Sequence, residues 1–221
     1  MIVTSSGKET IKIQRADMSV INKLIDICRK CFPTSLKHNV PREIARKRWA
    51  ILISSPSLET YIIMVENKTV GFYTINIDVN GYARERARAP FVDKFAFYIG
   101  QISCLIAHPS HIKHIIEILR NRLHYSQKEA LKPNSSQIQA STIDKTAWGE
   151  LQGILPEYQG KGLAKHMQKF ILQRCIDLNK HIIAGNVKVN NLSTRSLLES
   201  FGYVATSESP AGGIIYKKPL P

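Results

Sequence analysis

Long apolar runs are absent from this sequence. A bilayer-spanning helix needs about 20 apolar residues, whereas the longest apolar stretch, residues 95–107, is shorter and contains Gln101 and Ser103. We interpret this stretch as a buried helix rather than a contact with a membrane surface. Residues 1–10 also lack the basic segment and apolar core of a secretory signal peptide. We therefore expect no membrane span and a cytoplasmic location.

Cysteine is scarce, with four residues, Cys28, Cys31, Cys104 and Cys175. Cys28 and Cys31 form a C-x-x-C pair, but a zinc site would need a second pair or matching histidines. A redox pair would lie at a helix N-terminus, where the thiol pKa is lowered. Here the pair follows an apolar helical pattern and lies at its far end, so we favour structural thiols.

Three histidines at a spacing of three, His108, His111 and His114, have no carboxylate or cysteine nearby. Such a set is more typical of a helix surface than of a metal site. We therefore predict no metal.

Acidic residues are few, with 17 Asp and Glu against 31 Lys and Arg, which gives a formal charge of +14. A basic surplus is compatible with nucleic acid, anionic lipid or phosphorylated small molecules, or simply with a solvated basic surface. Nucleic acid is not favoured, because no RNP motif or interleaving of aromatic and basic residues is present.

The periodicity of apolar residues predicts an α/β (α+β) chain. We expect strands at residues 10–14, 60–65, 70–79, 148–155, 182–189, 203–206 and 213–216, with a hairpin at 60–79. We expect helices from residue 20 to near Phe32-Pro33 and at residues 42–53, 111–131, 163–178 and 193–201. Pro41 is expected at the first position of its helix, and the basic residues 84–88 are expected to form an exposed loop.

A glycine-bearing turn, residues 156–162, joins a predicted strand to a predicted helix. The first turn of a helix has unpaired N–H groups and a partial positive charge. Glycines allow a diphosphate to approach such a turn closely. The segment Gln159-Gly-Lys-Gly-Leu-Ala164 is neither a P-loop nor a Rossmann fingerprint, so it predicts an anion site of another kind.

This segment resembles the coenzyme A loop of the GNAT acetyltransferase family. Residues 148–164, WGELQGILPEYQGKGLA, resemble the family's central strand and its [QR]-x-x-G-x-[GA] loop, with Gln159, Gly162 and Ala164 at the defining positions. Residues 191–203, NLSTRSLLESFGY, resemble the downstream motif. The resemblance implies one GNAT-like domain over residues 1–221, with a mixed central sheet, a β-α-β acyl-CoA-binding core, flanking helices and an insertion at about residues 80–146.

The resemblance also implies acetyl-CoA as co-substrate, with the loop amides on its pyrophosphate and its pantetheine arm between two splayed parallel strands, residues 148–155 and 182–189. The implied cofactor-binding residues are Ile154, Leu155, Gln159, Gly160, Lys161, Gly162, Leu163, Ala164 and Asn191. Lys161 has the alternative of a solvated loop lysine. Asn191 has the alternative of a helix cap.

Amine acylation requires a neutral amine, hence a base or a proton-accepting water. Glu150 is the candidate base, and strand alternation places it on one face with Gln152 and Ile154. A solvated strand carboxylate is the alternative. The oxyanion would need a fixed donor, which we expect to be a strand amide near Leu155.

One position departs from the family pattern. Many members carry a tyrosine before the Glu of the last helix, as acid for the leaving thiolate, whereas here Leu198 precedes Glu199. The acid must be another group or water, and Tyr203 and Tyr216 are not assigned this role merely as phenols.

Three acceptor hypotheses stay open. The insertion is expected to shape the acceptor pocket, and residues 95–112 weakly resemble GNAT proteins of bacterial polysaccharide synthesis, which acylate amino-sugar nucleotides. The acceptor could instead be a protein N-terminus, a lysine or an aminoacyl-tRNA, or the chain could be an acyl-CoA sensor without turnover. A small-molecule amine is the favoured partner, and a homodimer is left open.

Overall fold

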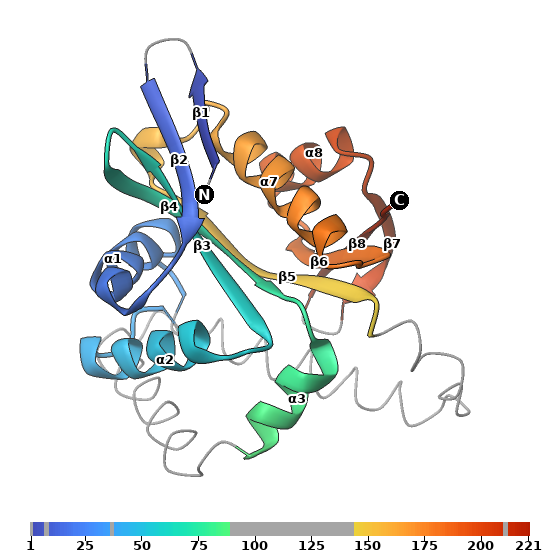
Figure 1. Cartoon of the computed structure of the whole chain (residues 1–221), viewed down its shortest axis with the longest axis horizontal. Helices are drawn as coiled ribbons and strands as arrows, with labels where there is room; N and C mark the ends of the chain where they lie inside the picture. Colours follow the sequence, from blue (N-terminus) through green and yellow to red (C-terminus); the bar gives the residue numbers. More distant parts are fainter. Residues whose placement is uncertain (1, 7–8, 36–37, 89–143, 210–211) are drawn as a thin grey trace.

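The strands form one mixed sheet. The computed structural model describes residues 2–6, 9–35, 38–88, 144–209 and 212–221. The eight strands lie in the order β1-β2-β3-β4-β5-β6-β8-β7, and β5 and β6 are parallel while the other neighbours are antiparallel (Figure 1). Their bounds are β1 Ile2–Ser6, β2 Glu9–Arg15, β3 Leu58–Val65, β4 Lys68–Asn76, β5 Thr146–Ile154, β6 Ile182–Lys188, β7 Val204–Ser209 and β8 Gly213–Pro219. The expected mixed sheet is confirmed.

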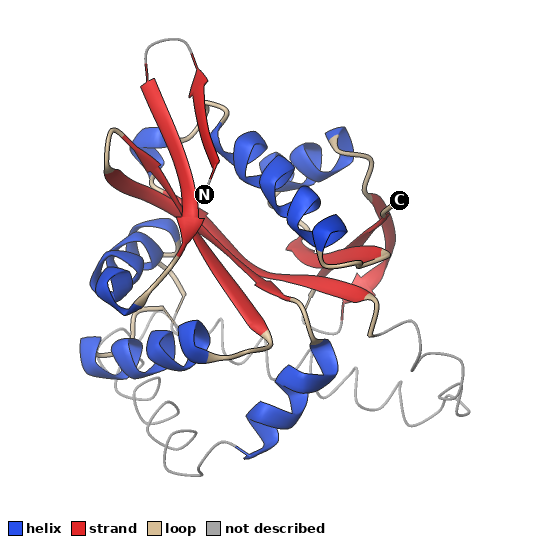
Figure 2. Cartoon of the chain, in the orientation of Figure 1, coloured by secondary structure: helices blue, strands red, loops and turns tan. Residues whose placement is uncertain are grey.

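Helices cover both faces of this sheet (Figure 2). Their bounds are α1 Ile21–Cys31, α2 Arg42–Ser54, α3 Val79–Arg88, α7 Leu163–Asp177 and α8 Leu192–Ser200, with short 3-10 helices η1 Met18–Val20 and η2 Pro156–Tyr158. Trp49 of α2 packs edge-on against Phe72 of β4, with ring centroids 5.3 Å apart. Phe170 of α7 packs likewise against Tyr61 of β3, whose strand partner is Tyr73. Because Phe72 and Tyr73 are consecutive, α2 and α7 lie on opposite faces.

A buried ion pair fastens α7 to the sheet. Glu59 of β3 is 2% exposed, and Arg174 donates to both of its carboxylate oxygens, at 2.7 and 2.9 Å. Tyr61 donates its hydroxyl to the same carboxylate at 2.7 Å. Burial alone would raise the pKa of Glu59, but the hydrogen bonds from Arg174 and Tyr61 outweigh it and lower that pKa. The carboxylate is therefore held in its charged form.

The prediction of an exposed loop at residues 84–88 is wrong, because these residues belong to α3. Asp78 begins this helix, since its carboxylate accepts the Gly81 N–H at 2.7 Å and satisfies an otherwise free donor. The strand expected at 70–79 accordingly ends at Asn76. Pro41 is the residue before the first helical position of α2, not the first position itself. The short edge strand β1 was not expected.

Several predictions lie outside the described residues. They concern the apolar stretch 95–107, the helix 111–131, the three histidines, Cys104 and most of the insertion at about 80–146. Within the ranges described, no helix combines the length and apolar composition needed to cross a membrane. In the same ranges, no group of three or more His, Cys, Asp or Glu side chains is arranged to hold a metal ion.

Candidate functional site

The parallel strands β5 and β6 diverge in the middle of the sheet. They pair from Thr146 opposite Ile182 to Gly149 opposite Gly185, and residues 150–154 have no described partner in β6. On its other side β5 stays paired with β4 as far as Ile154. An opening therefore forms beside the second half of β5.

Two backbone amides of β5 point toward this opening. Leu155 donates its N–H to the Val70 carbonyl of β4 at 2.9 Å. In an antiparallel pair, alternate residues direct their N–H groups at the partner strand, so Gln152 and Ile154 direct theirs to the β6 side. The Leu155 amide is thus engaged, and the strand donors near it that face the opening are those of Ile154 and Gln152.

The glycine loop follows directly and begins α7. Gly160 and Gly162 have φ of +77° and +76°, a left-handed conformation that favours glycine. Among the described residues, the amides of Gly160, Lys161 and Gly162 donate no hydrogen bond. Those of Leu163 and Ala164 begin the helix, where N–H groups have no intrahelical partner. Five successive free amides at a helix N-terminus suit a diphosphate.

Gln159, unlike the loop residues that follow it, donates hydrogen bonds from both its backbone and its side chain. Its N–H is used within η2, donated to the Pro156 carbonyl at 3.2 Å. Its side-chain Nε2 donates to the Ile154 carbonyl at 2.9 Å, and Cys31 Sγ from α1 lies 3.2 Å from the same oxygen. Burial, with a contribution from Glu157, raises the pKa of the Cys31 thiol to about 11, so this thiol is protonated at neutral pH. Gln159 thus holds the end of β5 against the loop, and Cys31 holds it against α1.

Positive charge gathers beside the loop. Lys161 and Lys68 place their ammonium groups 4.9 and 5.3 Å from the centroid of the Tyr158 ring. Cations within about 6 Å of an aromatic ring are attracted to its face. Tyr158 thereby keeps two lysines next to the free amides of the loop.

Asn191 is the N-cap of α8, so the alternative considered from the sequence is realised. Its Oδ1 accepts the Thr194 N–H at 3.2 Å and faces the Ser193 hydroxyl at 3.1 Å. Arg195 fixes the same turn by donating to the Val189 carbonyl at 3.1 Å. The Asn191 side chain is exposed, and its Nδ2 is the group that could contact a pantetheine arm.

Glu150 lies at an irregularity of β5. Thr74 pairs with Leu151 and the next residue, Ile75, pairs with Gly149, so Glu150 is an extra residue of β5 between two paired positions. This is a β-bulge, which re-aims a side chain. Glu150 Oε1 accepts from Nδ2 of Asn76 at 3.3 Å.

The bulge takes Glu150 out of the regular alternation of β5. Gln152 is opposite Tyr73, and Asn76, three residues further along β4, is on the other face. Simple alternation does not continue through a bulge, so the expectation that Glu150 shares a face with Gln152 and Ile154 stays a prediction. The Glu150 side chain is exposed.

The buried phenols near the opening are poor acids. Burial raises the pKa of Tyr73 and of Tyr203 well above the usual range for a phenol. Tyr203 contacts Nε2 of Gln168 at 2.6 Å, and Tyr216 donates to Glu199 at 2.7 Å. Leu198 is buried, so it offers only packing where the family pattern has a tyrosine.

Comparison with known sequences supports the motif. The Acetyltransferase (GNAT) family model matches residues 136–203, which contain the loop and the α8 turn, and the expected resemblance is thereby confirmed. Over 60 residues the chain is 29% identical to the L-amino acid N-acyltransferase MnaT of Escherichia coli (strain K12). That match covers 27% of this chain and 35% of the relative.

Solved structures share the fold. An N-acetyltransferase from Staphylococcus aureus Mu50 aligns with a TM-score of 0.59 at 9% identity, over 96% of this chain and 99% of that one. The PaiA N-acetyltransferase from Thermoplasma acidophilum, solved in complex with coenzyme A, aligns with a TM-score of 0.56 at 10% identity, over 95% and 99%. At these identities the likeness shows a common fold.

Proposed function

We propose an acyl-transfer function for this chain, whose fold and loop motif are those of the GNAT family. It would be an acyl-CoA-dependent N-acyltransferase that passes an acetyl group from acetyl-CoA to a primary amine in a ternary complex. One observation carries the proposal: the free amides from Gly160 to Ala164 follow the end of β5, whose second half is not paired with β6. A diphosphate on the loop would thus continue into an extended arm between the strands.

The residues present fit coenzyme A. Its diphosphate would accept hydrogen bonds from the loop amides, and Lys161 and Lys68 would balance its charge. Among the residues that the structure describes, a Cβ at Gly160 or Gly162 would meet no atom within 4 Å, so these residues leave room over the loop. Within the cofactor set, Gln159 would contribute by shaping the loop and Leu155 by its position rather than its amide. Ile154 would supply a free strand amide.

The chemistry needs a base and an oxyanion donor. The amine nitrogen attacks the thioester carbonyl carbon, a C–N bond forms and the C–S bond breaks. Glu150, directly or through water, would take the proton that the amine loses, and the thiolate would take a proton from water. The developing oxyanion would accept from the amide of Ile154 or Gln152.

The acceptor is a small-molecule amine in this proposal. The relative that is 29% identical over 60 residues is named for L-amino acids, and the amino-sugar nucleotides expected from the sequence are a second class of small amine. We would incubate the chain with acetyl-CoA and a panel of amino acids, amino-sugar nucleotides and peptides with free N-termini. Mass spectrometry would detect the mass of one added acetyl group.

Each outcome of this panel decides between functions. Acetylation of one small amine supports the proposal, and acetylation of peptides alone would replace the acceptor class. Binding of acetyl-CoA without any product would favour a sensor. Glu150→Gln should lower kcat by about 100-fold or more, the usual contribution of a general base, and an unchanged kcat would remove Glu150 from that role.

A further inference from the structure

Asn76 of β4 contacts the carboxylate of Glu150. Glu150 is the extra residue of a bulge and its side chain is exposed. A flexible side chain ordered for catalysis loses rotamer freedom, which contacts with rigid neighbours offset. The contact from Asn76 is one that can do so.

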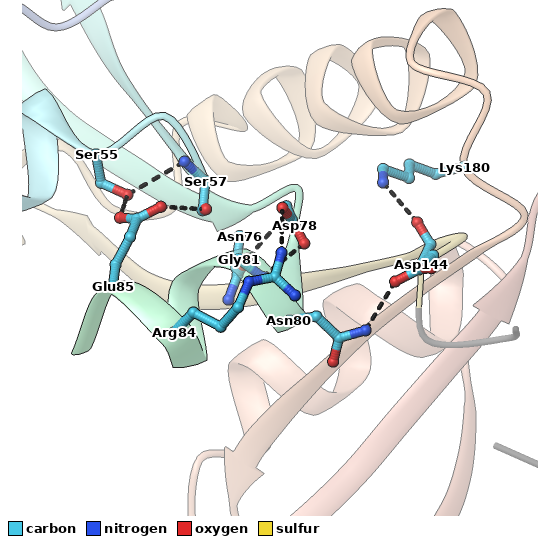
Figure 3. A network of polar contacts seen from close by, with 10 residues as sticks. All are labelled: Ser55, Ser57, Asn76, Asp78, Asn80, Gly81, Arg84, Glu85, Asp144 and Lys180. Atoms are coloured by element: carbon cyan, nitrogen blue, oxygen red, sulfur yellow. Dashed lines mark hydrogen bonds and ion pairs between the residues drawn. The ribbon is translucent and has the colours of Figure 1, made fainter. Parts of the chain in front are cut away.

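Asn76 is itself rigid. It is the last residue of β4 and 2% exposed. Its Oδ1 accepts the backbone N–H of Asp78 at 3.1 Å, as Figure 3 shows beside the first turn of α3. The same turn is tied to the preceding loop, because Ile77 and Asp78 both direct their N–H groups at the Ser57 carbonyl, at 2.9 and 3.4 Å.

This contact fixes which end of the Asn76 amide faces Glu150. A backbone N–H can only donate, so the atom that receives it must be the oxygen. Nδ2 is therefore the atom turned to Glu150, and it can only donate. The Asn76 amide thus points a donor at Oε1 of Glu150, 3.3 Å away.

From this geometry we propose that Asn76 is a positioning residue of Glu150. Its carboxamide, anchored on the turn before α3, holds the Glu150 carboxylate in place beside the bulge of β5. The inference rests on the proposed function, because it gives Asn76 a task only if Glu150 acts as a base.

The Asn76→Asp variant separates positioning from support of the turn. Aspartate keeps an oxygen for the Asp78 N–H but places a second oxygen, not a donor, against Glu150. We expect kcat to fall about 10- to 100-fold, the scale of a misplaced catalytic group, with the KM for acetyl-CoA changed by less than about twofold. Thr74→Val is the matched control, since Thr74 is a buried polar residue of the same strand whose hydroxyl contacts Thr60 at 3.1 Å. It should leave kcat within about twofold.

A double-mutant cycle tests whether Asn76 acts through Glu150. In a Glu150→Ala background, Asn76→Asp should change kcat by less than about twofold, because its target is gone. Equal losses in both backgrounds, or no loss in the first, would overturn the proposal.

Nuclear magnetic resonance tests the contact between Asn76 and Glu150 without any catalytic turnover. The Asn76 side-chain NH2 signal, assigned by its disappearance in Asn76→Asp, should shift in the nitrogen–proton correlation spectrum of Glu150→Ala. A signal that does not shift would overturn the contact. A chain that acetylates no amine would instead overturn the proposed function while this measurement still decides whether Asn76 holds Glu150.

Discussion

The Tyr73 hydroxyl lies where a side chain on Gly149 would begin. A Cβ added to Gly149 would be 2.5 Å from Tyr73 Oη and 3.4 Å from the ring carbon that bears it. Gly185, the partner of Gly149 across the last paired position of β5 and β6, has a different environment. A Cβ there would have its nearest neighbour, the Gly149 carbonyl oxygen, at 3.7 Å.

Gly149→Ala should therefore destabilise the chain, by about 1–3 kcal/mol for an overpacked buried position. Adding Tyr73→Phe should recover most of the loss, because only the hydroxyl is in the way. Gly185→Ala is the control and should change the free energy of unfolding by less than about 1 kcal/mol. Urea denaturation measures all of these variants. A double variant no more stable than Gly149→Ala would show that the hydroxyl is not the obstacle.

The two loop glycines should matter more for coenzyme A than for stability. Gly160→Ala and Gly162→Ala meet no neighbour within 4 Å, so their cost is the left-handed backbone, about 1–2 kcal/mol. Each should also turn free amides away from a diphosphate and weaken acetyl-CoA binding about tenfold or more. Gly212→Ala is a matched control, with φ of +76°, no neighbour within 4 Å and a place between β7 and β8. Calorimetry showing equal affinity losses for Gly212→Ala and Gly162→Ala would contradict a direct role of the loop.

The Glu59–Arg174 pair should dominate the acid sensitivity of this part of the fold. Arg174→Met leaves a buried carboxylate without its bidentate partner and should cost about 3–5 kcal/mol at pH 7. Arg42→Met, the control, breaks an exposed ion pair with Asp26 at 3.2 Å and should cost at most about 1 kcal/mol.

The pH dependence follows from the lowered pKa of Glu59 in the folded state. The pair's contribution is complete above the unfolded value of 4.5 and is lost as the pH falls through the lower, folded value. The gap in stability between the wild type and Arg174→Met should therefore shrink below pH 4.5. Denaturation curves with the same gap at pH 7 and in acid would contradict this assignment.

Local signals explain what the sequence predicted well. The strand, glycine turn and helix around Gln159 and Gly162 are set by neighbours along the chain, and the structure has them at nearly the expected residues. The helix α3 was missed because its basic residues resembled a loop, although Asp78 was available as its N-terminal cap.

The features of the site that the sequence did not predict depend on contacts between residues that are distant in the sequence. Asn76 meets Glu150 across 74 positions, and Cys31 meets Ile154 across 123. The bulge at Glu150 arises from the register of β4 against β5, which no period-two pattern reveals. A candidate base could be named from the sequence, but neither the bulge that contains it nor its contact with Asn76 could be.

Calorimetric titration of the chain with acetyl-CoA tests the central claim most directly. The account predicts binding to one site per chain, with a clear loss of affinity in Gly162→Ala and not in Gly212→Ala. The absence of binding to acetyl-CoA, or binding that the loop glycine does not affect, would contradict it.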